Sequence, residues 1–154
     1  MANYLLDTNV ALRLADLSSP QNALVTEAVA TLLEQQQVCY LSPQVLTELW
    51  VIATRPTDVN GLGWSAARTT EEISRLMDEF PLLEESQQVF SIWLNLVTTL
   101  SILGKRAHDA RIAATMLAYG VTHLLTFNTK DFIQVPDIKA VDPQAVVSAS
   151  YDQL

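Results

Sequence analysis

Short apolar runs alternate with segments of helical spacing, and this alternation constrains the fold more than any other feature of the chain. The apolar runs lie at 4–6, 38–41, 81–83, 123–127 and 138–141 and have the length of buried strands. Segments with helical spacing lie at 8–17, 21–36, 43–55, 65–80, 89–103 and 109–120. Strands that alternate with helices pair in parallel, because each helix carries the chain back across the sheet. The sequence therefore predicts an α/β domain with a mostly parallel sheet.

Several residues mark where the predicted helices start and stop. Ser42 followed by Pro43 is a typical N-cap and first-turn pair. Gly104 and Gly120 are typical of helix ends. The segment 89–103 is apolar on nearly every side, which predicts a helix at the centre of the core. The tail from Asp142 is expected to be loosely held.

The chain has the size of one ordinary domain, at 154 residues. We assign 1–145 to a single domain and 146–154 to a short C-terminal tail. The single cysteine, Cys39, excludes a disulfide within the chain. No apolar run approaches the roughly 20 residues of a membrane span, and Asp7 interrupts the apolar start that a signal peptide would need. A cytoplasmic protein that does not engage a membrane is expected.

Acidic and amide side chains follow the predicted strands. Asp7 ends the first strand, Glu48 lies in the second turn of the helix after the second strand, and Asp109 begins a later helix. Asn128 and Asp131 follow the strand at 123–127. The carboxyl ends of parallel strands share one edge of the sheet with the starts of the helices that follow them. We therefore expect these oxygen donors to meet at that edge.

Each acid also has an ordinary explanation when it is taken alone. Asp7 suits a helix cap, Asp109 an ordinary first-turn acid, and Glu48 a surface position beside an apolar face. Together they favour a cation site, because several carboxylates without a counter-charge repel one another. Mg²⁺ and Mn²⁺ prefer carboxylate and water oxygens. Such an ion can polarise a phosphodiester and lower the pKa of a bound water.

The overall charge limits how the chain could hold nucleic acid. A formal net charge of −8 argues against a broad phosphate-binding surface. Lys105, Arg106 and Arg111 bracket Asp109 and form a local basic cluster, which either holds a phosphate backbone or balances charge. Arg13 and Arg55 are either further phosphate contacts or partners of nearby acids.

Three sequence blocks resemble the PIN-domain nucleases, and among them most closely the toxin subunits of VapBC-type toxin–antitoxin pairs. The blocks are YLLDTNVAL, LSPQVLTELWVI and HDARIAATMLAYGVTHLLTFNTKDF, in the order of that family. The resemblance implies a three-layer α/β/α sandwich around a central, mostly parallel sheet. It also implies Mg²⁺- or Mn²⁺-dependent cleavage of RNA.

The resemblance carries over residue by residue. Asp7, Glu48 and Asp109 match the family's catalytic and metal-binding acids. Asn128 stands where many members have a fourth aspartate, and it is included among the candidate catalytic residues with one negative charge fewer. Asp131 either supports the residues that bind the metal, without binding it itself, or caps the short turn into Phe132.

Three further residues have two interpretations each. Thr8 either contacts a ligand water or phosphate, or caps a helix. Asn9 either orients the Asp7 carboxylate or is a solvated first-turn residue. Thr126 either contacts the site or is a strand residue that faces a helix.

The sequence therefore predicts a metal-dependent endoribonuclease that hydrolyses RNA phosphodiester bonds, with Mg²⁺ or Mn²⁺ as cofactor. As a type II toxin it would have an RNA substrate, a cognate antitoxin protein and a second copy of itself as partners. The alternative is a catalytically weak or inactive PIN-fold protein that acts as an RNA- or protein-binding module. A receiver-type signalling domain fits poorly, because no mid-chain phosphoacceptor aspartate follows a predicted strand.

Overall fold

The computed structural model describes residues 2–132 and 135–152 and forms a four-stranded sheet in which all strands are parallel. The strand order is β2-β1-β3-β4, with β1 at Asn3–Leu6, β2 at Val38–Tyr40, β3 at His123–Leu125 and β4 at Lys139–Val141. The predicted parallel α/β architecture is confirmed. The run at 81–83 is not a strand of this sheet, since only Leu82 forms an isolated parallel bridge, to Leu41.

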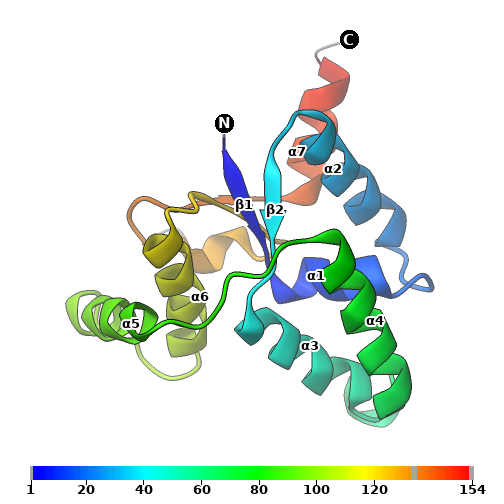
Figure 1. Cartoon of the computed structure of the whole chain (residues 1–154), viewed down its shortest axis with the longest axis horizontal. Helices are drawn as coiled ribbons and strands as arrows, with labels where there is room; N and C mark the ends of the chain where they lie inside the picture. Colours follow the sequence, from blue (N-terminus) through cyan, green and yellow to red (C-terminus); the bar gives the residue numbers. More distant parts are fainter. Residues whose placement is uncertain (1, 133–134, 153–154) are drawn as a thin grey trace.

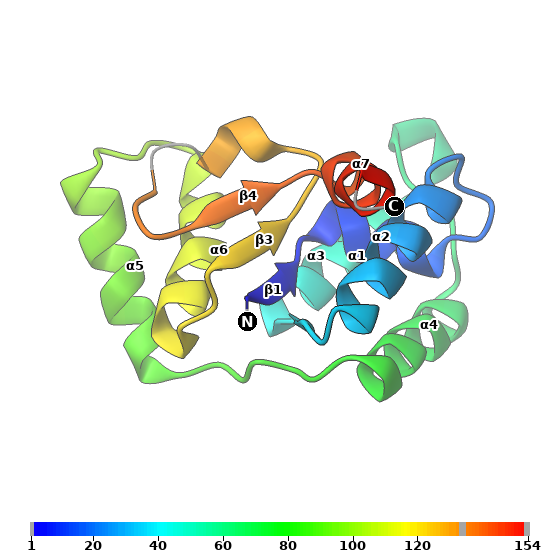
Figure 2. The ribbon, with the colours of Figure 1, turned by 90° about the horizontal axis from the view of Figure 1, so that it is seen from above.

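The helices cover both faces of this sheet (Figures 1 and 2). They are α1 (Thr8–Ala15), α2 (Asn22–Glu34), α3 (Pro43–Thr54), α4 (Ala66–Glu79), α5 (Gln87–Thr99), α6 (Arg106–Tyr119) and α7 (Pro143–Asp152). Short 3₁₀ helices lie at η1 (Thr57–Val59) and η2 (Thr129–Phe132). Within the described ranges, no helix is long and apolar enough to cross a bilayer.

The strand β1 shows how the two faces separate. Side chains alternate along a strand, so Tyr4 and Leu6 pack into the apolar cluster of α1–α4 and α7. Leu5 points to the opposite face and packs with Ile112 and Met116 of α6. The sheet therefore lies between two helical layers, in the predicted α/β/α arrangement.

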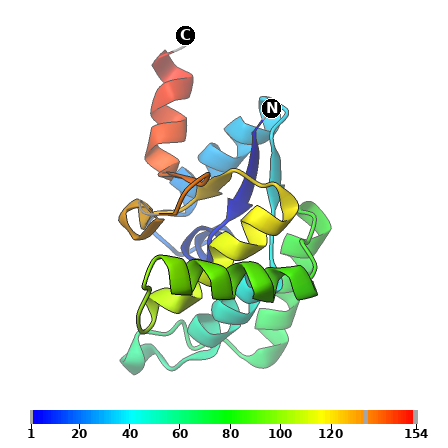
Figure 3. The same cartoon turned by 90° about the vertical axis from the view of Figure 1, so that its left-hand side faces the viewer.

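The helix α5 lies at the periphery instead of at the centre of the core, so this prediction is wrong. It packs against α6 as the outermost helix on its side (Figure 3). Val89 and Leu96 are buried there, whereas Phe90 and Leu94 are 61% and 49% exposed. An apolar sequence therefore shows that a helix can be buried, but it does not determine how much of the helix surface packs against other elements.

The chain after Asp142 forms a packed helix where the sequence favours a loose tail. The helix α7 lies beside α2, and its Val146 and Val147 are buried in the larger core cluster. Residues 153–154 of the predicted tail lie outside the described residues.

The carboxyl edge of the sheet is closed by local capping interactions. The Asp7 amide donates to the Leu125 carbonyl at 3.0 Å and so extends the pairing of β1 with β3 by one residue. The Ser42 hydroxyl accepts a hydrogen bond from the Val45 amide at 3.3 Å, which is the predicted N-cap of α3. Because β1 is central, Asp7 leaves the sheet at the middle of this edge.

Candidate active site

Asp7 is both a helix cap and a buried acid. Its Oδ1 accepts a hydrogen bond from the Thr8 amide at 2.8 Å, at the start of α1, and the residue is only 6% exposed. Burial raises the pKa of the Asp7 carboxyl, hydrogen bonds from Thr126 and Thr8 lower it, and the charges of Glu48 and Asp131 raise it again. Asp7 therefore caps α1 and is at the same time a buried acid of the candidate site, so its two predicted roles do not exclude each other.

Thr126 and Asn9 fix the other oxygen of Asp7. The Thr126 hydroxyl donates to Asp7 Oδ2 at 2.7 Å and accepts from the Asn128 amide at 3.0 Å. The Asn9 Nδ2 lies 3.4 Å from the same Oδ2, and its Oδ1 accepts from the Phe127 amide at 3.2 Å. Asn9 thus connects α1 to the chain after β3, and both side chains hold the Asp7 carboxylate in one orientation.

Glu48 reaches the same edge from α3. Its Oε2 accepts from the Thr8 hydroxyl at 2.6 Å, and its Oε1 accepts from Gln44 Nε2 at 3.0 Å. Thr8 therefore contacts both acids, Asp7 through its amide and Glu48 through its hydroxyl. Glu48 is half-buried, as expected for an acid beside the apolar side of its helix.

Asp109 lies in the first turn of α6, and the other acids of the site affect the pKa of its carboxyl. Burial raises the pKa of its carboxyl to about 6, with further contributions from the charges of Asp131, Asp7 and Glu48, while Arg106 opposes the rise. Charges must be near one another for such an effect, because solvent screens distant pairs. The structure therefore brings Asp7, Glu48, Asp109 and Asp131 together, as the topology predicts.

Asn128 and Asp131 form the solvent side of this cluster. Both are exposed, and the Asp131 amide donates to the Asn128 carbonyl at 3.1 Å within the turn that leads into η2. The turn carries Asp131 close enough to raise the pKa of both Asp7 and Asp109. Asn128 adds an uncharged amide at the same place.

The basic residues occupy two sides of Asp109. The helix α6 begins at Arg106, three residues before the predicted start, so Lys105 and Arg106 lie at its N-terminal end. The helix dipole disfavours cations there. Arg106 Nη2 donates to the Asp131 carbonyl at 3.3 Å, and its charge offsets part of the repulsion at Asp109. Both side chains are exposed at the mouth of the acidic cluster.

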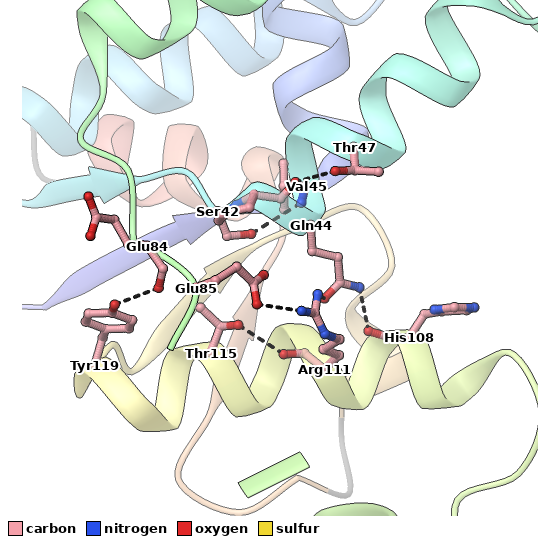
Figure 4. Close-up of polar contacts among 11 residues, drawn as sticks. Ser42, Gln44, Val45, Thr47, Glu84, Glu85, His108, Arg111, Thr115 and Tyr119 are labelled. Atoms are coloured by element: carbon pink, nitrogen blue, oxygen red, sulfur yellow. Dashed lines mark hydrogen bonds and ion pairs between the residues drawn. The ribbon is translucent and has the colours of Figure 1, made fainter. Parts of the chain in front are cut away.

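Arg111 lies one turn of α6 further on and is held by neutral and acidic partners. Its Nη2 pairs with Glu85 Oε2 at 2.6 Å, and its Nη1 lies 3.5 Å from Gln44 Oε1 (Figure 4). The pair is partly exposed, with side-chain exposures of 38% and 47%. Arg111 thus borders the site on the side of Glu48.

Gln44 is the residue of the site that the sequence does not single out. Its Nε2 donates to Glu48 Oε1 at 3.0 Å. The same Nε2 donates, at 2.8 Å, to the carbonyl of His108 in α6 (Figure 4). It therefore couples the helices that carry Glu48 and Asp109. The signal for it is its position one turn before Glu48, since residues four apart share a helix face.

The chemistry of these donors fits a hard divalent cation. Within 2–132 and 135–152, no group of three or more His, Cys, Asp and Glu side chains forms a ready-made metal-binding group. Mg²⁺ keeps several waters and is usually bound through one or two carboxylates. Burial and neighbouring negative charges raise the pKa values of Asp7 and Asp109, and a bound cation relieves this repulsion.

Comparison with known proteins places the chain in a family. The model of the PIN domain family matches residues 4–138. The chain belongs to the PIN domain family. This match confirms the resemblance and spans every residue of the acidic cluster.

A curated relative of this PIN domain is Ribonuclease VapC from Rickettsia bellii (strain RML369-C). The two are 34% identical over 103 residues, which is 66% of this chain and 74% of the relative.

Solved structures share the fold. VapBC2 from Rickettsia felis, bound to a DNA fragment from its promoter, matches with a TM-score of 0.67 and 19% identity, over 91% of this chain and 98% of that chain. VapBC-1 from nontypeable Haemophilus influenzae matches with a TM-score of 0.66 and 22% identity, over 92% of this chain and 98% of that chain. At these identities the likeness supports the PIN fold alone.

Proposed function

We propose that this PIN domain is an endoribonuclease that uses Mg²⁺ or Mn²⁺ to hydrolyse RNA phosphodiester bonds. The observation that carries the proposal is that Asp7, Glu48 and Asp109 lie at one edge of the sheet, where burial, and then the charges of Asp131, Asp7 and Glu48, raise the pKa of Asp109 to about 6. Acids with perturbed pKa values that gather on a scaffold of this kind are typical of active sites.

The three acids would hold the cation between the ends of three elements. Asp7 would supply a buried and firmly oriented carboxylate, and Glu48 and Asp109 would supply half-buried carboxylates. When bound, the ion polarises the phosphodiester, lowers the pKa of a water and offsets charge on the leaving oxygen. Asn128 keeps the negative charge of the cluster one unit lower than a fourth aspartate would.

The surrounding residues would orient the ligands and the substrate. Thr8 and Thr126 donate to the carboxylates of Glu48 and Asp7 and limit their rotation. One of the carboxylates of the cluster would position the attacking water. Lys105 and Arg106, exposed beside Asp109, would attract the RNA backbone in a protein that is otherwise acidic.

The relatives support a toxin of a type II toxin–antitoxin pair. The curated relative carries the name Ribonuclease VapC. Structures that share the fold include VapBC complexes and Mycobacterium tuberculosis VapC20, which is described as a toxin that cleaves the sarcin–ricin loop. By this analogy we propose a cognate antitoxin and a homodimer as partners in the cytoplasm.

Cleavage of a mixed RNA pool by the purified protein tests the proposal. Wild type and Asp109→Asn are compared with Mg²⁺, with Mn²⁺ and with EDTA, and Asp58→Asn in the exposed turn η1 serves as the matched control. Cutting by wild type and the control that needs metal, and that Asp109→Asn lacks, supports a nuclease. Equal behaviour of wild type and Asp109→Asn contradicts it. A folded wild type that binds RNA but never cuts it supports the binding-module alternative.

A further inference from the structure

A cleft of about 670 Å³ borders the acidic cluster between α3 and α6. Glu48 belongs to its lining, so the cleft is continuous with the site proposed above. Pro43, Val51 and Ile52 give α3 an apolar wall there, and His108 and Arg111 form the wall from α6. The volume lies within the range of pockets that bind small organic ligands.

Arg55 ends α3 at the far end of this wall and differs from the other arginines. Its Nε is buried, and within the described part of the chain the side chain makes no hydrogen bond or ion pair. Other arginines are engaged: Arg13 lies over the Phe127 ring, Arg68 lies over Trp64, and Arg75 pairs with Glu72. A buried guanidinium nitrogen without a partner is costly. Arg55 also lines the cleft, so an anionic ligand there would pair with the part of the guanidinium group that faces the cleft.

Arg111 lines the same cleft, and its ion pair with Glu85 is weak. Its partner Glu85 also lines the cleft, and both side chains of the pair are more than a third exposed. Exposed ion pairs contribute about 0–1 kcal/mol. A phosphate group can therefore compete with Glu85 for Arg111, with a bidentate geometry that suits guanidinium groups.

We infer that this cleft binds a nucleotide of the RNA next to the bond that is cut. Arg55 and Arg111 hold a phosphate of that nucleotide, and the base lies against the apolar wall of Val51 and Ile52. Proteins contact single-stranded RNA through bases that are unstacked and splayed out, which lets one base enter a cleft of this kind. The inference rests on the proposed function, because it assigns the substrate neighbourhood of the same acidic site.

Charge supports an RNA ligand for this cleft. The chain has nine Lys and Arg residues against seventeen Asp and Glu residues. Two of those nine line this one cleft. An acidic protein that repels RNA over most of its surface needs such a local site to hold its substrate.

Binding of a short labelled single-stranded RNA of mixed sequence, followed by fluorescence anisotropy in EDTA, tests the inference without cleavage. Arg55→Met keeps the aliphatic stem and removes the charge. Its Kd is expected to rise about tenfold, the loss that one charge-assisted hydrogen bond accounts for. Arg75→Met, on the exposed surface of α4, removes the same charge elsewhere and is expected to change Kd less than about twofold.

The salt dependence separates a phosphate contact from a structural role. The slope of log K against log salt is expected to shrink by about 0.7 in Arg55→Met, because one phosphate contact to a single strand is lost. Arg55→Lys keeps the charge and should retain the slope. Glu85→Gln removes the competitor of Arg111 and should tighten binding.

Each outcome bears on the inference. Equal affinities and slopes for Arg55→Met and Arg75→Met overturn it, and so does the absence of saturable binding by wild type in EDTA. If RNA binds through Arg55 but metal never permits cleavage, the subsite stands and the proposed function fails. If cleavage is intact and binding is indifferent to Arg55, the proposed function stands and the subsite fails.

Discussion

At the residue scale, the hydroxyl of Thr126 has the clearest measurable role. Thr126 is fully buried and donates to the Asp7 carboxylate, which lowers the pKa of that acid. Thr126→Val should therefore destabilise the protein at pH 7 by about 1–3 kcal/mol, because a buried charge loses its donor. Urea unfolding measures the effect. Thr126→Ser keeps the hydroxyl and is the control, so equal losses in the two variants would contradict this role.

Asp109 should make the metal-free protein less stable as pH rises. Its pKa is about 6 in the folded state, above the ordinary value of 3.8 for an aspartate. The folded state therefore holds more protons between these values, and the stability contributed by this group is present at about pH 4 and lost as pH rises through about 6.

Removing the Asp109 charge should consequently stabilise the metal-free protein. In EDTA at pH 7.5, Asp109→Asn is expected to melt about 2–4 °C above wild type, the shift for about 1 kcal/mol in a domain of this size. The expected shift in melting temperature is small because solvent screens the charge of a half-exposed group. The difference should vanish near pH 4. A variant that melts below wild type at pH 7.5 would show that Asp109 is stabilised by its neighbours and not repelled by them.

The sequence predicts some of these residues and misses others for a physical reason. Asp7, Glu48 and Asp109 stand at strand ends and helix starts, and parallel topology brings such positions together. Gln44 hydrogen-bonds to α6 through its long side chain, and this contact between two helices cannot be predicted from the spacing of residues along one helix. The link from Asn9 to the Phe127 amide spans more than a hundred residues and depends on strand order.

At the element scale, α7 tests how far the domain extends. The sequence places the boundary at residue 145, whereas Val146 and Val147 are buried against the core. Truncation after Ala145 should cost about 2–4 kcal/mol of unfolding free energy, since burying a Val side chain contributes about 1.5–3 kcal/mol at most.

The control for this truncation lies on the same helix. Tyr151→Phe removes only an exposed hydrogen bond to Glu27, at 2.8 Å, and should leave stability nearly unchanged. Chemical denaturation compares the three proteins. A truncated chain as stable as wild type would support the boundary that the sequence predicts.

Elements are predictable from the sequence where a pattern has a single solution. Strands β1 to β4 follow apolar runs, and α3 follows its Ser-Pro start. The run at 81–83 and the apolar helix α5 show the limit, because a hydrophobic pattern does not state which neighbours are present. Leu82 finds a single bridge partner, and Phe90 finds too few contacts to be buried.

At the scale of the whole molecule, the negative net charge limits how the acidic site can attract RNA. A net charge of −8 disfavours general RNA binding, so affinity for RNA would have to come from local arginines such as those around the cluster. The parallel sheet contributes the one edge where Asp7, Glu48 and Asp109 can meet.

Direct titration of Mn²⁺, followed by electron paramagnetic resonance of the free ion, tests whether the acidic cluster binds a metal. We expect saturable binding to wild type and to Asp58→Asn, with affinity at least tenfold weaker in Asp109→Asn and in Glu48→Gln, since each loses one carboxylate ligand. Binding should also weaken as pH falls below about 6, because Asp109 must lose its proton. Equal Mn²⁺ affinity in wild type, Asp109→Asn and Glu48→Gln would contradict a metal centre at this edge of the sheet.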